Sequence, residues 1–388
     1  MTPTGMTSTG MTPIRVKGHF LNSGVLVHEW LAEYGGSENV FDTFTEMFPT
    51  ADLLCLWSDV PNRYPGRRLQ ETSLARSRIR RSKPATVPAS LVAWRRREGR
   101  HDWALISTHL FAHHYSERRA GKALKKYLYV HSPARYIWEP QLDRRGASAV
   151  VRLAAPPLRA IDRVRAKEAY AVAANSSFVA ERIARTWHRH STVIHPPVDV
   201  QRIHTVLEAP RLSAHEHQVL ESLPATFVLG ASRMVPYKAL DLVIQAAAAL
   251  DVPCVLAGSG PDEGRLRALG GAARVPVTFV PKPSDALLYN LYRRCAAYVF
   301  PAVEDFGLMP VEALAAGAPI VVGPVGGARE IVGDTKAGVI ADSTRPADLA
   351  AAAVVAMGLD RAQCSARAQD FSKEAFKERV YGWMASAG

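Results

Sequence analysis

The stretch Tyr298–Val332 reads YVFPAVEDFGLMPVEALAAGAPIVVGPVGGAREIV, and its pattern indicates the fold class. An apolar run leads into a loop with Glu304 and Asp305. A helix with Glu312 follows, and then a second apolar run at Ala318–Gly323. Short apolar runs separated by a helix are typical of buried parallel strands. The stretch therefore predicts a strand–helix–strand unit of an open α/β sheet, with its acidic residues between the strands.

The loop after the first of these strands is a candidate ligand site, because ligands of open parallel sheets bind at the carboxyl ends of the strands. Phe306, Gly307 and Leu308 open the helix, where backbone N–H groups are placed to receive an anion or a polar ligand. Glu312, about one turn further on, is placed to accept hydrogen bonds from ligand hydroxyls. Acidic residues near a helix N-terminus also complement the helix dipole without any ligand, so the motif alone leaves both interpretations open.

The same alternation of apolar runs and helical patterns continues along the chain and predicts a parallel sheet in each half. Gly35 and Gly36 follow the first expected strand, and Ser37 is the expected N-cap of the next helix. Paired glycines let the backbone approach a ligand closely, although they are also common in ordinary turns. Strands are expected at Gly24–His28, Asp52–Trp57, Ala104–Ser107, Leu128–His131, Ala171–Asn175, Thr226–Ala231, Pro253–Ala257, Val277–Val280 and Ala297–Phe300.

The length of 388 residues favours two domains, since single cores rarely grow that large. Pro196 and Pro197 cannot lie inside a helix or a central strand, so they mark a boundary. We therefore predict an α/β protein with two facing Rossmann-like, doubly wound domains and a cleft between them. The expected segments are a disordered tail at 1–17, an N-terminal domain at 18–198, a C-terminal domain at 199–370 and a helix at 371–388. This last helix could pack on either domain, and one option is that it crosses back to the N-terminal domain.

Composition disfavours several classes of protein. No apolar run approaches the roughly 20 residues that a membrane-spanning helix needs. No secretory leader is expected, because the first residues lack an apolar core, and Met1, Met6 and Met11 are three candidate starts. The four cysteines are far apart and show no C-x-x-C spacing, so neither a disulfide framework nor a cysteine-based metal site is indicated. A reduced, cytoplasmic setting is expected.

Positive charge is concentrated in the N-terminal half. Residues 1–200 contain 30 Lys and Arg against 17 Asp and Glu, whereas residues 201–388 contain 18 against 19. Residues 61–100 alone hold 12 basic and 2 acidic side chains, with runs at Arg76–Arg81 and Trp94–Arg97 and an apolar segment between them. Three interpretations remain open: a solvated basic face, docking on an anionic membrane surface, and nucleic-acid binding, for which no accompanying motif is found.

Two cations in the C-terminal half complete the candidate site. Arg233 and Lys238 lie on the loop after the strand Thr226–Ala231, just before a helix, where both can converge on a phosphate-bearing ligand. Without the loop from Glu304 to Glu312, both would be interpreted as ordinary surface cations. The chain has no G-x-x-x-x-G-K-[ST] motif and no G-x-G-x-x-G after its first strand, which disfavours a nucleoside triphosphatase and a simple dehydrogenase.

Taken together, these motifs resemble a known family. Glu304 and Glu312 stand at the spacing of the glutamate-x7-glutamate signature of retaining glycosyltransferase family 4, whose members have the GT-B fold. Ala315–Val321 and Gly326–Val332 continue the family's pattern, and Gly230–Ala246 looks like its diphosphate-binding loop. In the first half, VHEWLAEYGGSEN, LYVHSPARYIWE and AANSSFVAERI are similar to the mannosyltransferase-like branch, so the resemblance covers nearly the whole chain after residue 20.

The resemblance implies a role for each matching residue. Arg233 and Lys238 would neutralise the diphosphate leaving group, and Glu312 would hold the ribose hydroxyls. Glu304 would hold the donor sugar together with the backbone amides of Phe306, Gly307 and Leu308. The remaining implied roles belong to the N-terminal half: His131 beside the anomeric carbon, Gly35 and Gly36 allowing the first helix to approach the phosphate and the acceptor, and Arg135 as a candidate for an acceptor phosphate.

The reaction implied by the resemblance is retaining transfer of a hexose from a nucleotide-diphosphate sugar. GDP-mannose is the first candidate donor, with a lipid-linked or other glycan as the acceptor. UDP-glucose or another nucleotide sugar with a soluble small-molecule acceptor is the alternative. The base stays open because Pro281-Lys282-Pro283 differs from the family's usual glycine loop near the base site.

Neither a metal nor another cofactor is expected. No D-x-D pair occurs in the chain, so Arg233 and Lys238 would take the place of the usual metal bridge. A non-catalytic nucleic-acid-binding protein on this scaffold is a further alternative, disfavoured by the intact motifs. The expected location is cytoplasmic, with peripheral association at the inner face of the plasma membrane through residues 61–100 as an option.

Overall fold

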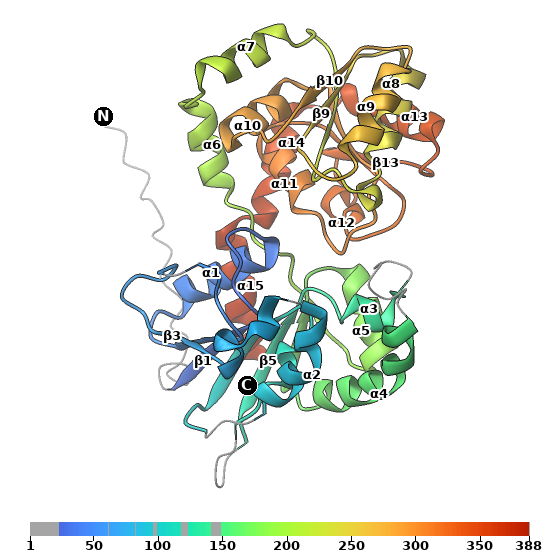
Figure 1. The fold of residues 1–388 in the computed structure, drawn as a ribbon. Coiled ribbons are helices and arrows are strands. Elements are labelled where there is room, and N and C mark those ends of the chain that lie inside the picture. Colours follow the sequence, from blue (N-terminus) through green and yellow to red (C-terminus); the bar gives the residue numbers. More distant parts are fainter. Residues whose placement is uncertain are drawn as a thin grey trace, which may run out of the picture.

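The computed structural model describes residues 23–60, 62–81, 83–95, 99–117, 123–140 and 149–387. In this part of the chain, two parallel sheets with their helices form two domains, which Figure 1 shows one above the other. The predicted fold class, α/β with two facing doubly wound domains, is confirmed. The tail expected at residues 1–17 lies outside the described residues.

In the described part of the N-terminal domain, seven parallel strands form the sheet, in the order β3-β2-β1-β4-β5-β6-β7. The inner strands are short apolar runs such as GVLVH, which is buried along its whole length because helices cover both faces of the sheet. The sequence pattern does not predict the edge strands β3 and β7, which are only three and two residues long. The strands are β1 (Gly24–His28), β2 (Asp52–Cys55), β3 (Leu69–Glu71), β4 (Trp103–Thr108), β5 (Lys125–Val130), β6 (Ala171–Ala174) and β7 (Thr192–Val193).

Helices sandwich this sheet. On one face, α1 (Gly36–Met47) presents apolar side chains at helical spacing, and α15 (Lys373–Ser386) packs in the same cluster. On the other face lie α2 (Lys83–Ala93), α4 (Ala149–Ala166) and α5 (Ser177–Trp187). The short helix α3 (Arg135–Trp138) follows β5.

The start of α1 differs from the expectation. The helix begins at Gly36 with Gly35 as its N-cap, and no side-chain hydrogen bond caps it among the described residues. Ser37 lies inside the first turn, so its hydroxyl does not occupy the capping position. It donates instead to Glu38 Oε2 at 2.8 Å.

Six parallel strands form the sheet of the C-terminal domain, in the order β10-β9-β8-β11-β12-β13. The strands are β8 (Val228–Ala231), β9 (Cys254–Ala257), β10 (Val277–Val280), β11 (Ala297–Phe300), β12 (Ile320–Val322) and β13 (Gly338–Ile340). The helices are α6 (Val200–Glu208), α7 (Ala214–Ser222), α8 (Leu240–Leu250), α9 (Glu263–Gly271), α10 (Asp285–Arg294), α11 (Leu308–Ala315), α12 (Arg329–Val332), α13 (Pro346–Met357) and α14 (Arg361–Ala368).

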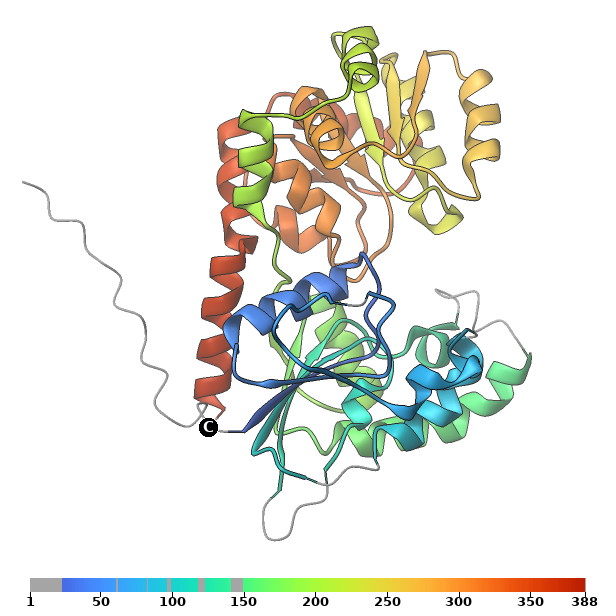
Figure 2. The ribbon, with the colours of Figure 1, turned by 60° about the vertical axis from the view of Figure 1, so that its left-hand side comes forward.

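Within the described residues, the chain crosses between the domains twice, and the two crossing segments lie side by side. The Val198 N–H donates to the carbonyl oxygen of Phe371 at 2.8 Å. Beyond this point α15 runs down along the N-terminal domain beside α1, as Figure 2 shows. Phe376 and Trp383 pack there against aromatic side chains of the sheet. The last helix therefore belongs to the core of the first domain.

A bilayer-spanning helix, with the length and apolar character that this requires, does not occur in the part of the chain that the structure describes.

Candidate active site

The carboxyl ends of two neighbouring strands bring a predicted cation and a predicted carboxylate together. β8 and β11 are adjacent in the C-terminal sheet. The loop after β8 carries Lys238 and the loop after β11 carries Glu304. Lys238 Nζ forms an ion pair with Glu304 Oε1, and the two side chains are 13% and 20% exposed. The sheet topology thus brings Lys238 and Glu304, which are distant in sequence, together in one site.

The surroundings of Lys238 favour loss of its proton. Burial lowers the pKa of Lys238 to about 8, and the charges of Arg233 and Arg135 add to this effect. Arg233 is exposed and donates from Nη2 to Tyr237 Oη at 3.0 Å. Cations that repel one another in a poorly hydrated place are stabilised by an anion. The region around Lys238 therefore favours the binding of an anionic ligand.

The loop that holds Glu304 packs on a turn formed by Gly326 and Gly327. The Gly327 N–H donates to the Glu304 carbonyl oxygen at 2.8 Å. A Cβ at Gly327 would lie 2.0 Å from the carbonyl oxygen of Asp305, so only glycine allows this approach. The turn therefore fixes the backbone from which Glu304 and Asp305 project.

The start of α11 lies against the opposite domain. Phe306 is buried, Gly307 is the N-cap with φ 99°, and Leu308 is the first helical residue. No side-chain hydrogen bond caps this start within the described residues, so its N–H groups keep their capacity for a ligand. A Cβ at Gly36 would lie 2.8 Å from Leu308 Cδ1. Gly36 thus lets the first turn of α1 approach the start of α11, whereas a Cβ at Gly35 would meet Glu38 Oε2 of the same helix at 2.1 Å.

Glu312 is a partly buried carboxyl group on α11. Burial raises the pKa of Glu312 to about 7, and Asp285 adds to the increase while Arg202 opposes it. Near neutral pH the group is therefore poised between its two forms. A carboxyl group in this state can both accept and donate hydrogen bonds to hydroxyls.

His131 follows β5 in the N-terminal domain. Its Nε2 lies 2.8 Å from Ser107 Oγ, and its backbone N–H donates to the Thr108 carbonyl oxygen at 2.9 Å. Burial lowers the pKa of His131 to about 3. The ring is therefore neutral at physiological pH and acts as a hydrogen-bonding group rather than as a cation.

A buried ion-pair network joins the two domains at the loop that carries the site, and the sequence pattern assigns no role to its central residues. Arg182 on α5 is 1% exposed, and its Nη1 donates to Asp305 Oδ1 of the opposite domain at 2.6 Å. Arg182 Nε lies 2.6 Å from Glu139 Oε2. Arg135 Nη2 lies 3.0 Å from Asp305 Oδ2. Arg135 thus pairs with the C-terminal domain in this structure, and its binding of an acceptor phosphate stays a prediction.

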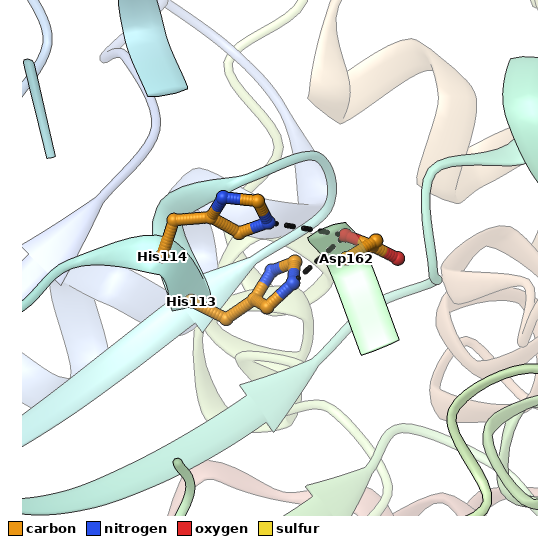
Figure 3. A group of neighbouring side chains, drawn as sticks. All are labelled: His113, His114 and Asp162. Atoms are coloured by element: carbon orange, nitrogen blue, oxygen red, sulfur yellow. Dashed lines mark hydrogen bonds and ion pairs between the residues drawn. The ribbon is translucent and has the colours of Figure 1, made fainter. Parts of the chain in front are cut away.

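A separate cluster of His113, His114 and Asp162 lies in the core of the N-terminal domain (Figure 3). The two imidazole Nε2 atoms lie 2.9 and 3.2 Å from Asp162 Oδ1. Trp138 and Trp187 donate their indole N–H groups to Asp162 Oδ2 at 2.7 and 2.6 Å. Both carboxylate oxygens already have partners, so the group serves to tie α4 and α5 to the turn after β4. The prediction that the protein uses no metal is not tested by this cluster.

Comparison with known proteins finds a family match in the C-terminal half. Residues 214–376 match the family described as "Glycosyl transferases group 1". The D-inositol 3-phosphate glycosyltransferase of Mycolicibacterium vanbaalenii is 32% identical over 196 residues, which are 46% of this chain and 43% of that protein. The enzyme of the same name from Mycobacterium sp. strain KMS is 33% identical over 202 residues, 48% of this chain and 45% of that protein. The match spans less than half the length of these curated relatives.

Solved structures share the fold over nearly the whole chain. HepE of Anabaena, in complex with UDP and glucose, has a TM-score of 0.64 at 16% identity and covers 94% of this chain and 100% of its own. Sucrose-phosphate synthase of Thermosynechococcus elongatus has a TM-score of 0.66 at 17% identity, with 95% and 100% covered. The predicted GT-B architecture is thus confirmed, and residues 214–376 match a glycosyltransferase family.

Proposed function

We propose that the protein is a retaining glycosyltransferase that moves a hexose from a nucleotide-diphosphate sugar to an acceptor. One observation carries the proposal: Lys238 and Glu304 meet at adjacent strand ends of a glycosyltransferase domain, with Arg233 beside them. The start of α11, where Leu308 lies against Gly36, adds free backbone N–H groups at the contact with the other domain.

The two cations suit a diphosphate leaving group. Breaking the anomeric C–O bond places negative charge on the diphosphate and positive charge on the sugar ring. Fixed cations aimed at the diphosphate stabilise the transition state more than the ground state. In the structure, Glu304 is the partner of Lys238. On donor binding, we expect the diphosphate to replace Glu304 there and the carboxylate to hold sugar hydroxyls.

The remaining residues have roles that fit their environments. Glu312, with its pKa near 7, would hold the ribose hydroxyls. Neutral His131 would donate or accept a hydrogen bond beside the anomeric carbon. Gly307 and Leu308 would present backbone N–H groups to the sugar, while the acceptor attacks on the face that the leaving group vacates. That geometry retains the anomeric configuration.

The same residues provide a reason to expect no metal. The chain has no D-x-D pair, which is the usual ligand for a cation that bridges a sugar diphosphate. Arg233 and Lys238 supply the positive charge from the protein itself, and Arg can bind the phosphate oxygens in bidentate fashion. The reaction should therefore proceed in the presence of a chelator.

GDP-mannose is the first candidate donor, on the resemblance of the N-terminal half to mannosyltransferases. UDP-glucose is the second candidate, favoured by the solved complex of HepE with UDP and glucose. Several relatives are named for D-inositol 3-phosphate, a small phosphorylated acceptor. A phosphate-bearing acceptor also fits the basic N-terminal half, whether that phosphate is on a lipid carrier or on a soluble molecule.

An anionic membrane surface is the proposed partner of the basic stretch. Arg76, Arg78 and Arg80 are exposed there, and Ile79 and Val92 are 45% and 48% exposed between the charges. Interleaved arginines and apolar side chains suit the interface of an anionic bilayer. Such docking would place the enzyme at the cytoplasmic face of the membrane, next to lipid-linked acceptors.

The second arginine run, Trp94–Arg97, contributes less to the proposed membrane-docking surface than its sequence suggests. Trp94, the first residue of this run, is fully buried because it packs in the core beneath α2. Arg95 Nη1 pairs with Glu168 at 2.8 Å. Arg96 and Arg97 lie outside the described residues. The proposed docking surface therefore consists of Arg76–Arg80 and Val92.

A thermal-shift panel tests the proposed function. GDP, UDP, ADP and TDP sugars are each added in EDTA, and a ligand at about 100 times its Kd stabilises the protein by roughly 2.7 kcal/mol. We expect one nucleotide sugar to raise the melting temperature of the wild type, and Lys238→Ala to need a higher concentration of that sugar for the same shift. No shift with any sugar, together with salt-sensitive binding of duplex DNA, would favour a non-catalytic nucleic-acid-binding protein instead.

Vesicle sedimentation tests the membrane partner. We expect binding to phosphatidylglycerol-containing vesicles that weakens with added salt and is reduced in Ile79→Glu. Val354→Glu is a matched control, because Val354 is 60% exposed on the other domain. Equal binding to neutral vesicles, or none to anionic ones, would leave residues 61–100 as a solvated basic face.

A further inference from the structure

A row of three side chains runs from the interior of the N-terminal domain to His131. His28 ends β1, and its registered neighbour on β4 is Ser107, so the two side chains lie on the same face of the sheet. Ser107 Oγ lies 3.0 Å from His28 Nδ1 and 2.8 Å from His131 Nε2. The hydroxyl therefore joins the two imidazole rings.

Both rings in the row are neutral. His28 is fully buried and stacks on Phe41 with ring centroids 5.0 Å apart. Burial holds the pKa of His28 well below its ordinary value, and the charge of Arg63 adds to the decrease. Burial likewise lowers the pKa of His131 to about 3. Each ring thus has one N–H and one bare nitrogen.

The single proton of the Ser107 hydroxyl allows two arrangements. In the first, His28 Nδ1–H donates to Ser107 Oγ, and the hydroxyl donates to His131 Nε2. In the second, His131 Nε2–H donates to Ser107 Oγ, and the hydroxyl donates to His28 Nδ1. The two arrangements give His131 opposite tautomers.

The far nitrogen of His28 distinguishes these arrangements. His28 Nε2 is buried and has no hydrogen-bond partner among the described residues. In the second arrangement this nitrogen carries a hydrogen, which leaves a buried N–H donor without an acceptor. A buried donor without a partner is rare and costly, whereas an acceptor without a partner is tolerated more often. The first arrangement is therefore favoured.

We propose that His28 and Ser107 are positioning residues that hold His131 in its Nδ1–H tautomer. In that form, the edge of the ring away from Ser107 donates a hydrogen bond. Of the three residues, only His131 is partly exposed. The inference rests on the proposed function for the group that receives this hydrogen bond, which would be an oxygen of the donor sugar.

The tautomer can be measured without any substrate. In long-range ¹⁵N–¹H spectra of full-length protein labelled with ¹⁵N-histidine, protonated and bare ring nitrogens give separate signals. The His131 pair is assigned by its loss in His131→Gln. We expect the Nδ1–H form in the wild type and a change toward Nε2–H in Ser107→Ala. Ser107→Thr, which keeps the hydroxyl, and His28→Asn, which keeps an N–H near the Nδ1 position, should retain it.

Thr43→Val is the matched control, because Thr43 is equally buried on α1 and its hydroxyl donates to the Asn39 carbonyl oxygen within the helix. An Nε2–H signal for wild-type His131 would overturn the proposal, even if the Ser107 variants did not fold. A tautomer that does not change in folded Ser107→Ala would overturn it as well.

Kinetics test the role of the tautomer in transfer. With a donor from the thermal-shift panel, Ser107→Ala should lower kcat by about tenfold at unchanged KM, the size of one lost hydrogen bond. Ser107→Thr should restore the rate, and an unchanged kcat in Ser107→Ala would refute the positioning role. If the wild-type protein shows the predicted tautomer but no nucleotide sugar in the panel binds, the hydrogen-bonded row of His28, Ser107 and His131 would be supported. The proposed function would then be overturned.

Discussion

Replacing Lys238 by alanine should remove most of the activity and leave the fold at least as stable. Lys238 is 13% exposed, and burial lowers its pKa from 10.5 to about 8. The folded protein thus disfavours the ammonium form by about 3 kcal/mol relative to the unfolded chain. Because the folded pKa is the lower one, this cost is fully present below pH 8 and disappears as the pH rises toward 10.5.

The two effects of the substitution have different sizes. Loss of the pair with Glu304 offsets this gain in part or in full, because it leaves a partly buried carboxylate without its cation. The free energy of unfolding at pH 7 should therefore stay constant or rise by up to about 3 kcal/mol. Removal of a fixed charge from the leaving group should lower kcat by about 100- to 1000-fold.

Two measurements on one preparation check this prediction: release of nucleoside diphosphate at saturating donor, and calorimetric unfolding without ligand. Lys377→Ala is the control, because Lys377 also pairs with a glutamate, Glu46, but does so on α15 away from the site. A kcat within about threefold of the wild type would refute the assignment of Lys238 to the leaving group. A marked fall in the melting temperature would show that the lysine has a structural role instead.

The remaining predictions concern pH, the glycine turn and the domain contact. The value of kcat/KM should fall below pH about 7, as Glu312 is protonated, and above pH about 8, as Lys238 loses its proton. Glu312→Gln should remove the decrease on the acid side of this pH profile. Gly327→Ala should lower the melting temperature and abolish the donor-induced thermal shift, because its Cβ would lie 2.0 Å from a backbone oxygen. Asp305→Asn should destabilise the protein by about 3–5 kcal/mol in urea unfolding, because it leaves buried Arg182 without its full counter-charge. In a double-mutant cycle, additivity of Asp305→Asn and Arg182→Met would contradict that pairing.

The sheets were predictable from sequence because parallel strands buried on both faces are continuous apolar runs. GVLVH and AYVF carry this signal in full. The edge strands β3 and β7 lack this signal, because they are short and only partly buried. The location of α15 was left open by the sequence. The apolar stripe of α15 shows that the helix packs against another part of the protein. Which domain it packs on depends on the path of the chain between the domains.

The candidate site was predictable where residues lie next to recognisable motifs. Lys238 and Glu304 each follow a strand, and adjacency of those strands brings them together. Asp305 was not assigned a role, because a sequence does not tell which of two neighbouring acidic side chains turns toward the other domain. Arg182 looks like any helix arginine until its burial is known. Ser107 and His28 were missed for a similar reason, since their hydrogen bonds depend on strand register.

The first sugar released when water is the acceptor tests the central claim most directly. The donor from the thermal-shift panel, α-linked as in GDP-mannose or UDP-glucose, is incubated with the enzyme in EDTA and followed by proton NMR. A retaining, metal-independent enzyme releases the α anomer first, at a rate that EDTA does not change and that Lys238→Ala lowers by about 100- to 1000-fold. Initial release of the β anomer, or turnover only after a divalent metal is added, would contradict it.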